Sequence, residues 1–329
     1  MKKIFLLTFF LFFPIAFAQL GSESLVDDGT EPEIAYANLS ERFLVVYAKW
    51  TADRYDIYGR IYDKSLNALT SPFVIKSTSG DEDFPDVASN GTDFFVVWRD
   101  YTNSRIYGRV VSHTGSLGSE VLIANLQRKP AVGYGDGKYL VYYYNGSSEC
   151  WGKIYDEFGN VVKDNFKLAS DCDAEGEEVG IAFGNGRWVI SSWKSTSPYG
   201  ILIEVYPNGT TFYHSAYDWF AYYSSIAYGS NRFEVIGLPA PWDTTSLVKI
   251  FVFDVNLNFI QSFNLPSYSD TTSSKVDIAW GGNKFFAIWM DDYVPPENDR
   301  KTLGREIYLN NSYGDLIEFP TQYYSYQYD

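Results

Sequence analysis

The sequence contains few histidines and few cysteines, two of each, and this scarcity limits the chemistry that the protein can perform. The histidines, His113 and His214, are predicted to lie in an outer turn and on an outer strand of two different repeats. A zinc site needs several clustered nitrogen or sulfur ligands, and an activated nucleophile needs an adjacent base, which is most often histidine. The sequence therefore predicts no zinc site and no histidine-activated nucleophile.

Positive charge is also scarce, since 26 lysines and arginines stand against 41 aspartates and glutamates, a net charge of −15. Nucleic acids and anionic membrane surfaces repel such a chain, so we expect neither of them as a partner. The charge is compatible with cations or with a basic protein surface. It would equally keep a secreted protein in solution without any role in binding.

Only one long hydrophobic run is present, at residues 4–17, and it follows Lys2 and Lys3. The triplet Ala16-Phe17-Ala18 offers a cleavage site of the A-x-A type, which is typical of a secretory signal peptide. The sequence therefore predicts a signal peptide at residues 1–18 and a secreted, extracellular or cell-surface protein that begins at Gln19. No later run is long enough for a membrane span.

Six segments repeat one pattern. In each, an isoleucine or valine on the predicted first strand, here called the anchor, is followed by the aromatic residue that opens the second strand. The anchors lie 45 to 53 residues apart, which is typical of the blade of a four-stranded propeller. The residue after each anchor is alanine or glycine, as expected for strands that crowd together at a central axis. The anchors and their aromatic partners are Ile34 and Phe43, Val87 and Phe94, Val132 and Tyr139, Ile181 and Trp188, Ile226 and Phe233, and Ile278 and Phe285.

The second repeat shows its strands most clearly. Four apolar runs, at residues 86–88, 94–98, 106–111 and 120–124, are separated by an Asn-Gly turn, a polar loop and a glycine-containing turn. The second run is apolar on both faces, so each sheet is expected to lie between two others. The sequence therefore predicts an all-β fold, with residues 19–329 forming a single six-bladed β-propeller of four-stranded antiparallel blades.

The motif V-V-W-x-D followed by I-Y-G-R, seen at residues 96–100 and 106–109, resembles the blade repeats of secreted bacterial and archaeal β-propeller proteins. The marks of WD40 repeats and the S-x-D-x-G-x-T-W box of sialidases are absent. The resemblance therefore implies an architecture, and it carries no enzymatic residues with it.

Two segments near the ends compete to complete the sixth blade. Residues 22–27 precede the first anchor at the spacing of a fourth strand, and residues 315–321 follow the third strand of the sixth repeat. We expect terminal strands to close the ring. The surplus strand would form a fifth strand or pair with a neighbouring molecule, giving a homo-oligomer or filament, because an uncovered edge is a template for strand addition.

Three carboxylates occupy one position, directly before the anchor, in consecutive blades. They are Glu33, Asp86 and Asp277, and the other three blades have small residues there. In a closed ring they would form an arc at the mouth of the channel, and clustered oxygen ligands suit Ca²⁺. The alternative is that they are solvated loop carboxylates.

Aromatic and acidic side chains are interleaved in the loops that share the face of this mouth, and such a mixture can stack on sugar rings and bind hydroxyl groups. A glycan is therefore one candidate partner, although aromatic residues make up 19% of the chain and several must fall in any set of loops. Asp100 and Asp291 are also the candidate acids of a propeller glycoside hydrolase or lyase. The candidate binding residues are Trp50, Asp100, Tyr101, Trp242, Asp291, Asp292 and Tyr293.

The two cysteines, Cys150 and Cys172, could form a disulfide in a secreted protein. The cross-strand neighbour of Cys150 is expected near Phe166, about six residues before Cys172, so the loop after Ser170 would have to fold back. The spacing does not decide whether the disulfide forms. Secretion also permits glycosylation at five Asn-X-Ser/Thr sites, Asn38, Asn90, Asn145, Asn208 and Asn310.

These features favour a non-enzymatic extracellular protein with a structural or interaction role. Its partner is expected to be another protein, a second copy of itself or a glycan. A carbohydrate-binding or calcium-binding module and a propeller hydrolase or lyase are the alternatives. No other cofactor is expected.

Overall fold

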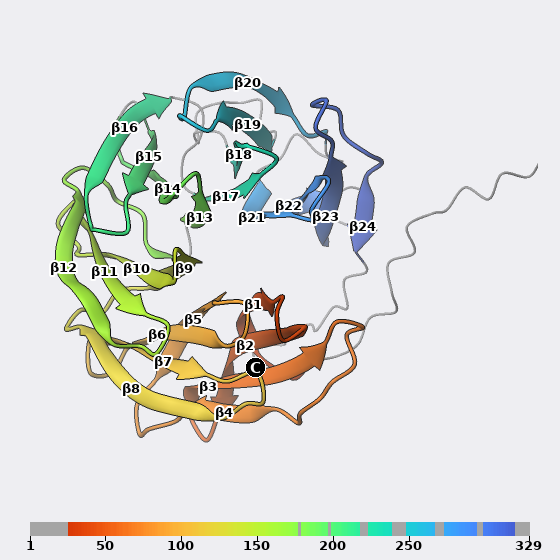
Figure 1. Ribbon diagram of the computed structural model, residues 1–329. Helices are drawn as coiled ribbons and strands as arrows, with labels where there is room; N and C mark the ends of the chain where they lie inside the picture. Colours follow the sequence, from red (N-terminus) through yellow and green to blue (C-terminus); the bar gives the residue numbers. More distant parts are fainter. Residues whose placement is uncertain are drawn as a thin grey trace, which may run out of the picture.

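The computed structural model describes residues 26–176, 179–196, 199–217, 223–238, 248–266, 273–294 and 299–319. In these ranges the chain forms 24 β-strands, arranged in six antiparallel sheets of four strands each. The sheets stand around a common axis like the blades of a propeller (Figure 1). The expected six-bladed β-propeller is therefore confirmed. No helix in these ranges is long and apolar enough to cross a lipid bilayer.

Each blade uses four strands that are consecutive in the sequence, and in each the first strand is the innermost. Blade 1 contains β1 (Thr30–Ala37), β2 (Arg42–Thr51), β3 (Arg54–Asp63) and β4 (Phe73–Lys76); blade 2 contains β5 (Glu82–Ser89), β6 (Phe94–Asp100), β7 (Arg105–Val111) and β8 (Leu117–Ala124); blade 3 contains β9 (Pro130–Gly135), β10 (Lys138–Tyr144), β11 (Cys150–Asp156) and β12 (Val161–Ala169). Blade 4 contains β13 (Gly180–Gly184), β14 (Arg187–Trp193), β15 (Gly200–Val205) and β16 (Thr211–Tyr217); blade 5 contains β17 (Ser224–Gly229), β18 (Arg232–Gly237), β19 (Lys249–Asp254) and β20 (Phe259–Asn264); blade 6 contains β21 (Ser273–Trp280), β22 (Phe285–Val294), β23 (Asp299–Ile307) and β24 (Ile317–Phe319).

In blades 1 to 5 the middle of the second strand is buried on both faces, and its successive side chains point in opposite directions. On β6, Val96 and Trp98 pack with residues of blade 1, whereas Phe95 and Val97 pack with residues of blade 3. Similar clusters join blades 3 and 4, blades 4 and 5, and blades 5 and 6. The main apolar core therefore lies between blades rather than inside any one of them.

The innermost strands approach one another closely, as the small residues after the anchors predict. A Cβ atom added to Gly133 on β9 would lie 2.5 Å from the Cγ2 atom of Ile181 on β13. One added to Gly180 would lie 2.5 Å from the backbone nitrogen of Ile226. Residues without a Cβ atom therefore let neighbouring blades meet at these two points.

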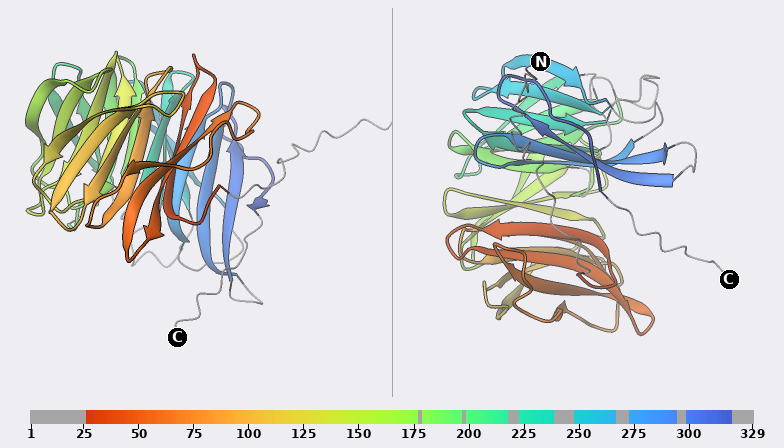
Figure 2. Two further views of the ribbon diagram at one scale, coloured as in Figure 1. Left: turned by 90° about the horizontal axis from the view of Figure 1, so that it is seen from below. Right: turned by 90° about the vertical axis from the view of Figure 1, so that its right-hand side faces the viewer.

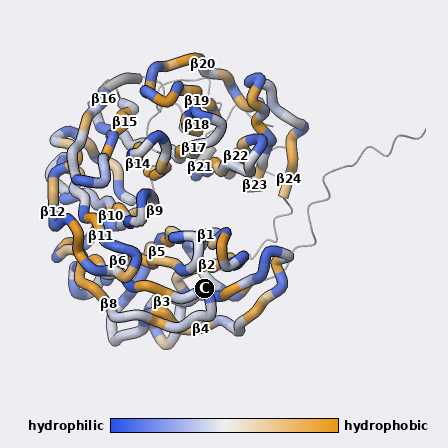
Figure 3. Tube along the Cα trace, viewed as in Figure 1, coloured by the Kyte–Doolittle hydropathy of each residue, from blue (hydrophilic) through white to orange (hydrophobic). Residues whose placement is uncertain are grey.

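The outer strands face solvent and are the least buried. The first five residues of β12 are all exposed, and only the last two are buried. The strands run along the propeller axis in Figure 2, and the outer strands carry both hydrophobic and hydrophilic residues in Figure 3. This mixture is what an outer strand with one solvated face requires.

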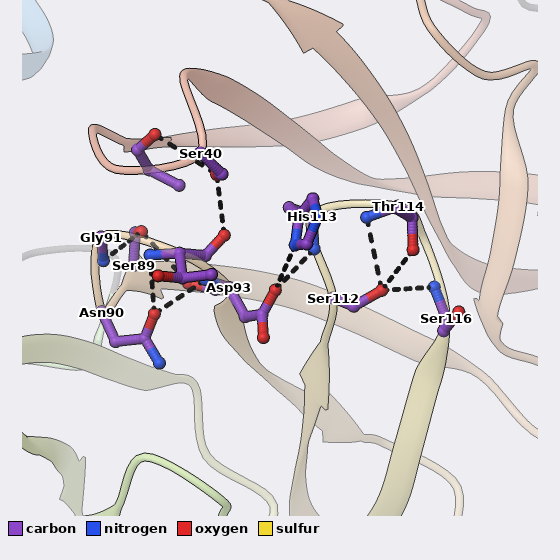
Figure 4. A network of polar contacts seen from close by, with 11 residues as sticks. Ser40, Ser89, Asn90, Gly91, Asp93, Ser112, His113, Thr114 and Ser116 are labelled. Atoms are coloured by element: carbon purple, nitrogen blue, oxygen red, sulfur yellow. Dashed lines mark hydrogen bonds and ion pairs between the residues drawn. The ribbon is translucent and has the colours of Figure 1, made fainter.

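The tight turns between first and second strands lie at the opposite end of the blades from the carboxylate positions. In the turn of blade 2, Asn90 Oδ1 accepts hydrogen bonds from the backbone nitrogens of Thr92 and Asp93, at 2.9 and 2.7 Å (Figure 4). Ser40 of blade 1 donates to the carbonyl oxygen of Thr92 at 2.8 Å, and Asp93 binds His113 at 2.9 Å. His113 is thus part of a structural network that joins turns of blades 1 and 2.

The ends of the chain do not share a sheet in the described ranges. Blade 6 takes its fourth strand, β24, from the expected 315–321 segment. The other candidate, residues 22–27, is described only at Val26 and Asp27, which form no strand and lie on blade 1. Asp27 binds Lys49 Nζ at 2.7 Å and Tyr47 Oη at 2.8 Å. These contacts hold Val26 and Asp27 on blade 1, so of the two candidates the 315–321 segment supplies the fourth strand of blade 6. Residues 22–25 lie outside the described residues.

Candidate functional site

The innermost strands of blades 1, 2 and 6, which are β1, β5 and β21, begin with an irregular pairing to the second strand. The innermost strands of blades 3, 4 and 5, which are β9, β13 and β17, pair regularly. In β1, β5 and β21 the pairing shifts in register near Glu31, Phe84 and Lys275. These three residues have φ angles of 54°, 46° and 52°, in the left-handed region that favours glycine. Such bulges redirect the side chains that follow them, and strained backbone is often kept at functional sites.

Each of these strained residues lies two positions before one of the three predicted carboxylates. The Asp86 side chain accepts hydrogen bonds from the backbone nitrogens of Val87 and of Val132 in blade 3, both at 2.7 Å. Asp277 Oδ1 accepts hydrogen bonds from Ser225 Oγ of blade 5 at 2.7 Å and from the backbone nitrogen of Ile278 at 2.8 Å. Both aspartates therefore tie their own blade to a neighbour.

The surroundings of these aspartates change their acidity. Burial raises the pKa of Asp86 to about 7, and the negative charge of Asp277 raises it further, against the lowering effect of the two backbone donors. Burial also raises the pKa of Asp277, against the hydrogen bonds from Ser225 and Ile278. An ordinary aspartate loses its proton at a pH far below 7. Asp86 differs from it, because it gains or loses its proton near pH 7.

A cavity of about 480 Å³ lies where the channel mouth opens, which is a volume typical of ligand pockets. Its polar wall contains Glu33, Asp86 and Asp277, together with Ser225 and Lys275. Its apolar wall extends between blades 6 and 1 and includes Ile34, Ile288, Trp289 and Met290. The cavity therefore combines charged groups at the axis with an apolar recess at one side.

The predicted calcium site has no ready-made geometry. The described residues contain no group of three histidine, cysteine, aspartate or glutamate side chains that could hold a metal ion. Glu33, Asp86 and Asp277 line one cavity, but both aspartates already accept hydrogen bonds from neighbouring blades. Calcium binding at this mouth stays a prediction.

The predicted aromatic surface is only partly placed. Trp50 and Tyr101 are exposed at 58% and 49%, and the ring of Trp50 meets that of Tyr55 edge-on at 4.9 Å. Neither Trp50 nor Tyr101 lines the cavity. Trp242 lies outside the described residues, as do the side chains of Asp291, Asp292 and Tyr293, whose backbone forms part of β22.

Asp100 is a structural residue of its loop. Its side chain is only 2% exposed, and it accepts hydrogen bonds from the backbone nitrogen and the Nδ2 atom of Asn103 at 2.9 and 3.0 Å. The carboxylate thus closes the turn between β6 and β7. A displayed binding or acid group at this position, as the sequence predicts, does not fit this burial.

The structure joins Cys150 and Cys172 in a disulfide, with Cα atoms 6.1 Å apart. The expected neighbour of Cys150 was misplaced, because Cys150 pairs with Ala169 rather than with a residue near Phe166. Register shifts between β11 and β12 insert extra residues into the outer strand and bring the chain closer to Cys172 before it turns.

The five candidate glycosylation sites differ in accessibility. Asn38, Asn208 and Asn310 are exposed, whereas Asn90 and Asn145 are half-buried. Asn145 Nδ2 also donates a hydrogen bond to Glu149 at 2.8 Å. Glycosylation stays a prediction, and the first three positions suit it best.

A second hollow, of about 400 Å³, lies on the outside between β8, β11 and β12. Its two charged residues, Lys153 and Asp164, form an ion pair at 2.9 Å. This pairing makes the hollow a weaker candidate than the channel mouth, where several charged groups meet an apolar wall.

No family model and no curated protein matches this chain. Solved structures do match it. A neuraminidase-like protein of A/little yellow-shouldered bat/Guatemala has a TM-score of 0.54 at 8% identity, with 85% of this chain and 94% of that one covered. The β-propeller domain of the Trilobed protease from Pyrococcus furiosus, described as having an open velcro topology, has a TM-score of 0.54 at 11% identity, with 89% and 85% covered. Trypanosoma rangeli sialidase has a TM-score of 0.51 at 11% identity, with 83% and 53% covered.

The likeness shows a shared fold. At such low identity it assigns no activity to this chain, because unrelated functions are built on one propeller architecture. The arrangement of side chains at the channel mouth therefore has to carry any proposal about function.

Phe84 and Lys275 were missed in the sequence analysis, and so was the left-handed backbone of Glu31. A left-handed conformation at a residue other than glycine leaves little trace in a sequence. A weak signal exists, since the segments Glu31-Pro32-Glu33 and Phe84-Pro85-Asp86 share a proline between the strained residue and the carboxylate.

Proposed function

We propose that this protein is a secreted, non-enzymatic interaction protein that binds a positively charged segment of a partner protein at the channel mouth. The observation that carries the proposal is the cavity of about 480 Å³, in which Glu33, Asp86 and Asp277 from three consecutive blades face a shared space beside an apolar recess. A lysine or arginine side chain presents a cationic head on an apolar stem, which suits both walls.

The overall charge supports this choice of ligand. The net charge of −15 attracts basic surfaces over distances of about a Debye length, roughly 8 Å at physiological salt. Lys275 lines the same cavity and reduces its negative charge. Binding is therefore expected to depend on salt and to need the contacts of a whole segment rather than of one side chain.

Pentalysine is a suitable probe, with titration calorimetry as the measurement. We expect the substitutions Asp86→Asn and Asp277→Asn each to weaken its binding about tenfold, since each removes one negative charge that faces the cavity. The wild-type affinity should rise between pH 6 and pH 8. Asp86, with a pKa of about 7, loses its proton in this window, whereas lysine stays charged throughout.

Two controls separate this site from general attraction to an acidic protein. The substitution Asp136→Asn removes the same charge from a turn at the opposite end of the blades, and it should leave the affinity unchanged. Pentalysine acetylated on its side chains should not bind. Equal losses in the Asp86→Asn and Asp136→Asn variants would show that the attraction is diffuse, and the proposal would then fail.

Glycoside hydrolysis is a second candidate, and the raised pKa of Asp86 favours it. A carboxyl group that keeps its proton near neutral pH can act as a general acid beside an ionised partner. The test is the release of nitrophenol from a panel of aryl glycosides. Activity that is lost in both the Asp86→Asn and Asp277→Asn variants would support an enzyme over a binding protein.

A further inference from the structure

The contact between blades 6 and 1 differs from the other five. Five clusters of buried side chains join consecutive blades from blade 1 to blade 6, and among the described residues none joins blade 6 to blade 1. The anchor of blade 1, Ile34, is 56% exposed, whereas its equivalents Val87, Val132, Ile226 and Ile278 are 4 to 7% exposed. The ring therefore has one incompletely packed interface, here called the seam.

Part of the blade 1 wall of the seam is covered by the chain that precedes β1. Val26 packs with Tyr47 and Tyr62, and its carbonyl oxygen accepts a hydrogen bond from Arg60 at 2.6 Å. This cover does not reach the inner part of the wall, where Ile34 and Tyr36 are exposed at 56% and 42%.

The wall of the seam on blade 6 is also apolar. Phe286, Ile288 and Met290 alternate on β22 with Phe285, Ala287 and Trp289, which are buried against blade 5. Phe286, Ile288 and Met290 are only half-buried, whereas Phe95 and Val97 at equivalent positions of blade 2 are fully buried. Ile34, Ile288 and Met290 line one cavity, so both walls border the same space.

The chain that follows β24 starts at the rim of this space. Phe319, the last residue of β24, pairs with Thr302 of β23, and Thr302 lines the same cavity. Because β24 runs toward the channel mouth, its last residue, Phe319, lies at that level. Ten extended residues reach about 33 Å, about twice the roughly 15 Å that separate the fourth strand of a sheet from its first.

Residues 320–329, P-T-Q-Y-Y-S-Y-Q-Y-D, have the chemistry of a strand that covers such a wall. Tyr324, Tyr326 and Tyr328 alternate with Ser325 and Gln327, so an extended backbone would put the three rings on one face. Tyrosine offers a large apolar ring and a hydroxyl group. This combination suits a wall that is aromatic and still reached by water.

We propose that residues 320–329 of this chain occupy the seam as an extended segment, with Tyr324, Tyr326 and Tyr328 against Ile34 and Tyr36 of blade 1. The segment completes the sixth interface between blades. A terminal segment then closes the ring, as expected from the sequence. It fills the apolar recess and leaves the carboxylates at the axis open, so in the full chain the apolar stem of a bound basic side chain would meet the tyrosine rings of this segment in place of the recess. The inference is argued from the packing of the seam and not from the proposed binding function.

Truncation after Phe319 is the first test. We expect the melting temperature to fall by roughly 5 °C or more, because an apolar interface is lost, and a synthetic peptide of residues 320–329 added in excess should restore it. The triple substitution Tyr324→Ser, Tyr326→Ser and Tyr328→Ser should act like the truncation, whereas Tyr323→Ser should not. A truncated protein that melts like the full chain would overturn the inference.

Cross-linking of the full chain tests the location directly and does not need the truncated protein to fold. A variant with Ile34→Cys and Tyr326→Cys should form a disulfide within one chain under mild oxidation, seen by mass spectrometry of its peptides. The matched control replaces Leu117, which is 42% exposed on β8, in place of Ile34. Cross-linking no greater than in this control would overturn the inference, and so would a cross-link that forms only between two chains.

Discussion

Replacing Trp98 by alanine should lower the free energy of unfolding by about 3 to 5 kcal/mol, the range for a large aromatic residue removed from a packed core. Trp98 is fully buried and packs among residues of blades 1 and 2. Because cores between blades supply most of the burial, a cavity there weakens the attachment of two blades at once. Guanidinium unfolding, followed by circular dichroism, measures the loss.

Trp50 provides the matched control for this result. It is 58% exposed and its ring meets that of Tyr55 at the surface, so Trp50→Ala should change the free energy of unfolding by less than about 1 kcal/mol. Similar losses in the two variants would contradict the assignment of the core to the interfaces between blades.

Removing the disulfide by the paired substitution Cys150→Ala and Cys172→Ala should cost about 3 kcal/mol of stability. The two residues are 22 positions apart, and a cross-link of that length restricts the unfolded chain by roughly this free energy. Both cysteines are fully buried, so alanine leaves no unpaired polar group in their place. Urea unfolding of both proteins measures the difference.

A reducing agent supplies the control for the disulfide. It should lower the unfolding midpoint of the wild-type protein toward that of the variant and leave the variant unchanged. Two reactive thiols in the unfolded, unreduced wild-type protein would disprove the bridge. A stable disulfide would agree with the proposed secretion, since such bonds persist in oxidising compartments.

The strands were predictable because their signals are local. The apolar runs of the second repeat correspond to parts of β5, β6, β7 and β8, and all six anchors lie on first strands. The tight turns are equally local. Asp136 and Gly137 both have positive φ angles, as expected for residue types that tolerate the left-handed conformation in a two-residue hairpin.

The candidate site was predictable only in part. The repeat pattern placed Glu33, Asp86 and Asp277 at equivalent positions, and all three line the cavity at the channel mouth. It could not show that Asp86 and Asp277 bind neighbouring blades, since these partners come from distant parts of the chain. It also treated Asp100 as a displayed residue, although the carboxylate is buried by its own loop.

The sequence by itself determined the number of blades, the strands and the double-sided burial of the sheets, because spacing and alternation are properties of neighbouring residues. Only the tertiary structure decided which charges share a space, how strongly burial raises the pKa of Asp86, and which interface is left incompletely packed. Those properties depend on the order in which blades meet around the axis. The incompletely packed interface arises where the first and last blades face one another, whereas the pKa of Asp86 is set at the axis by burial and by groups of blades 3 and 6.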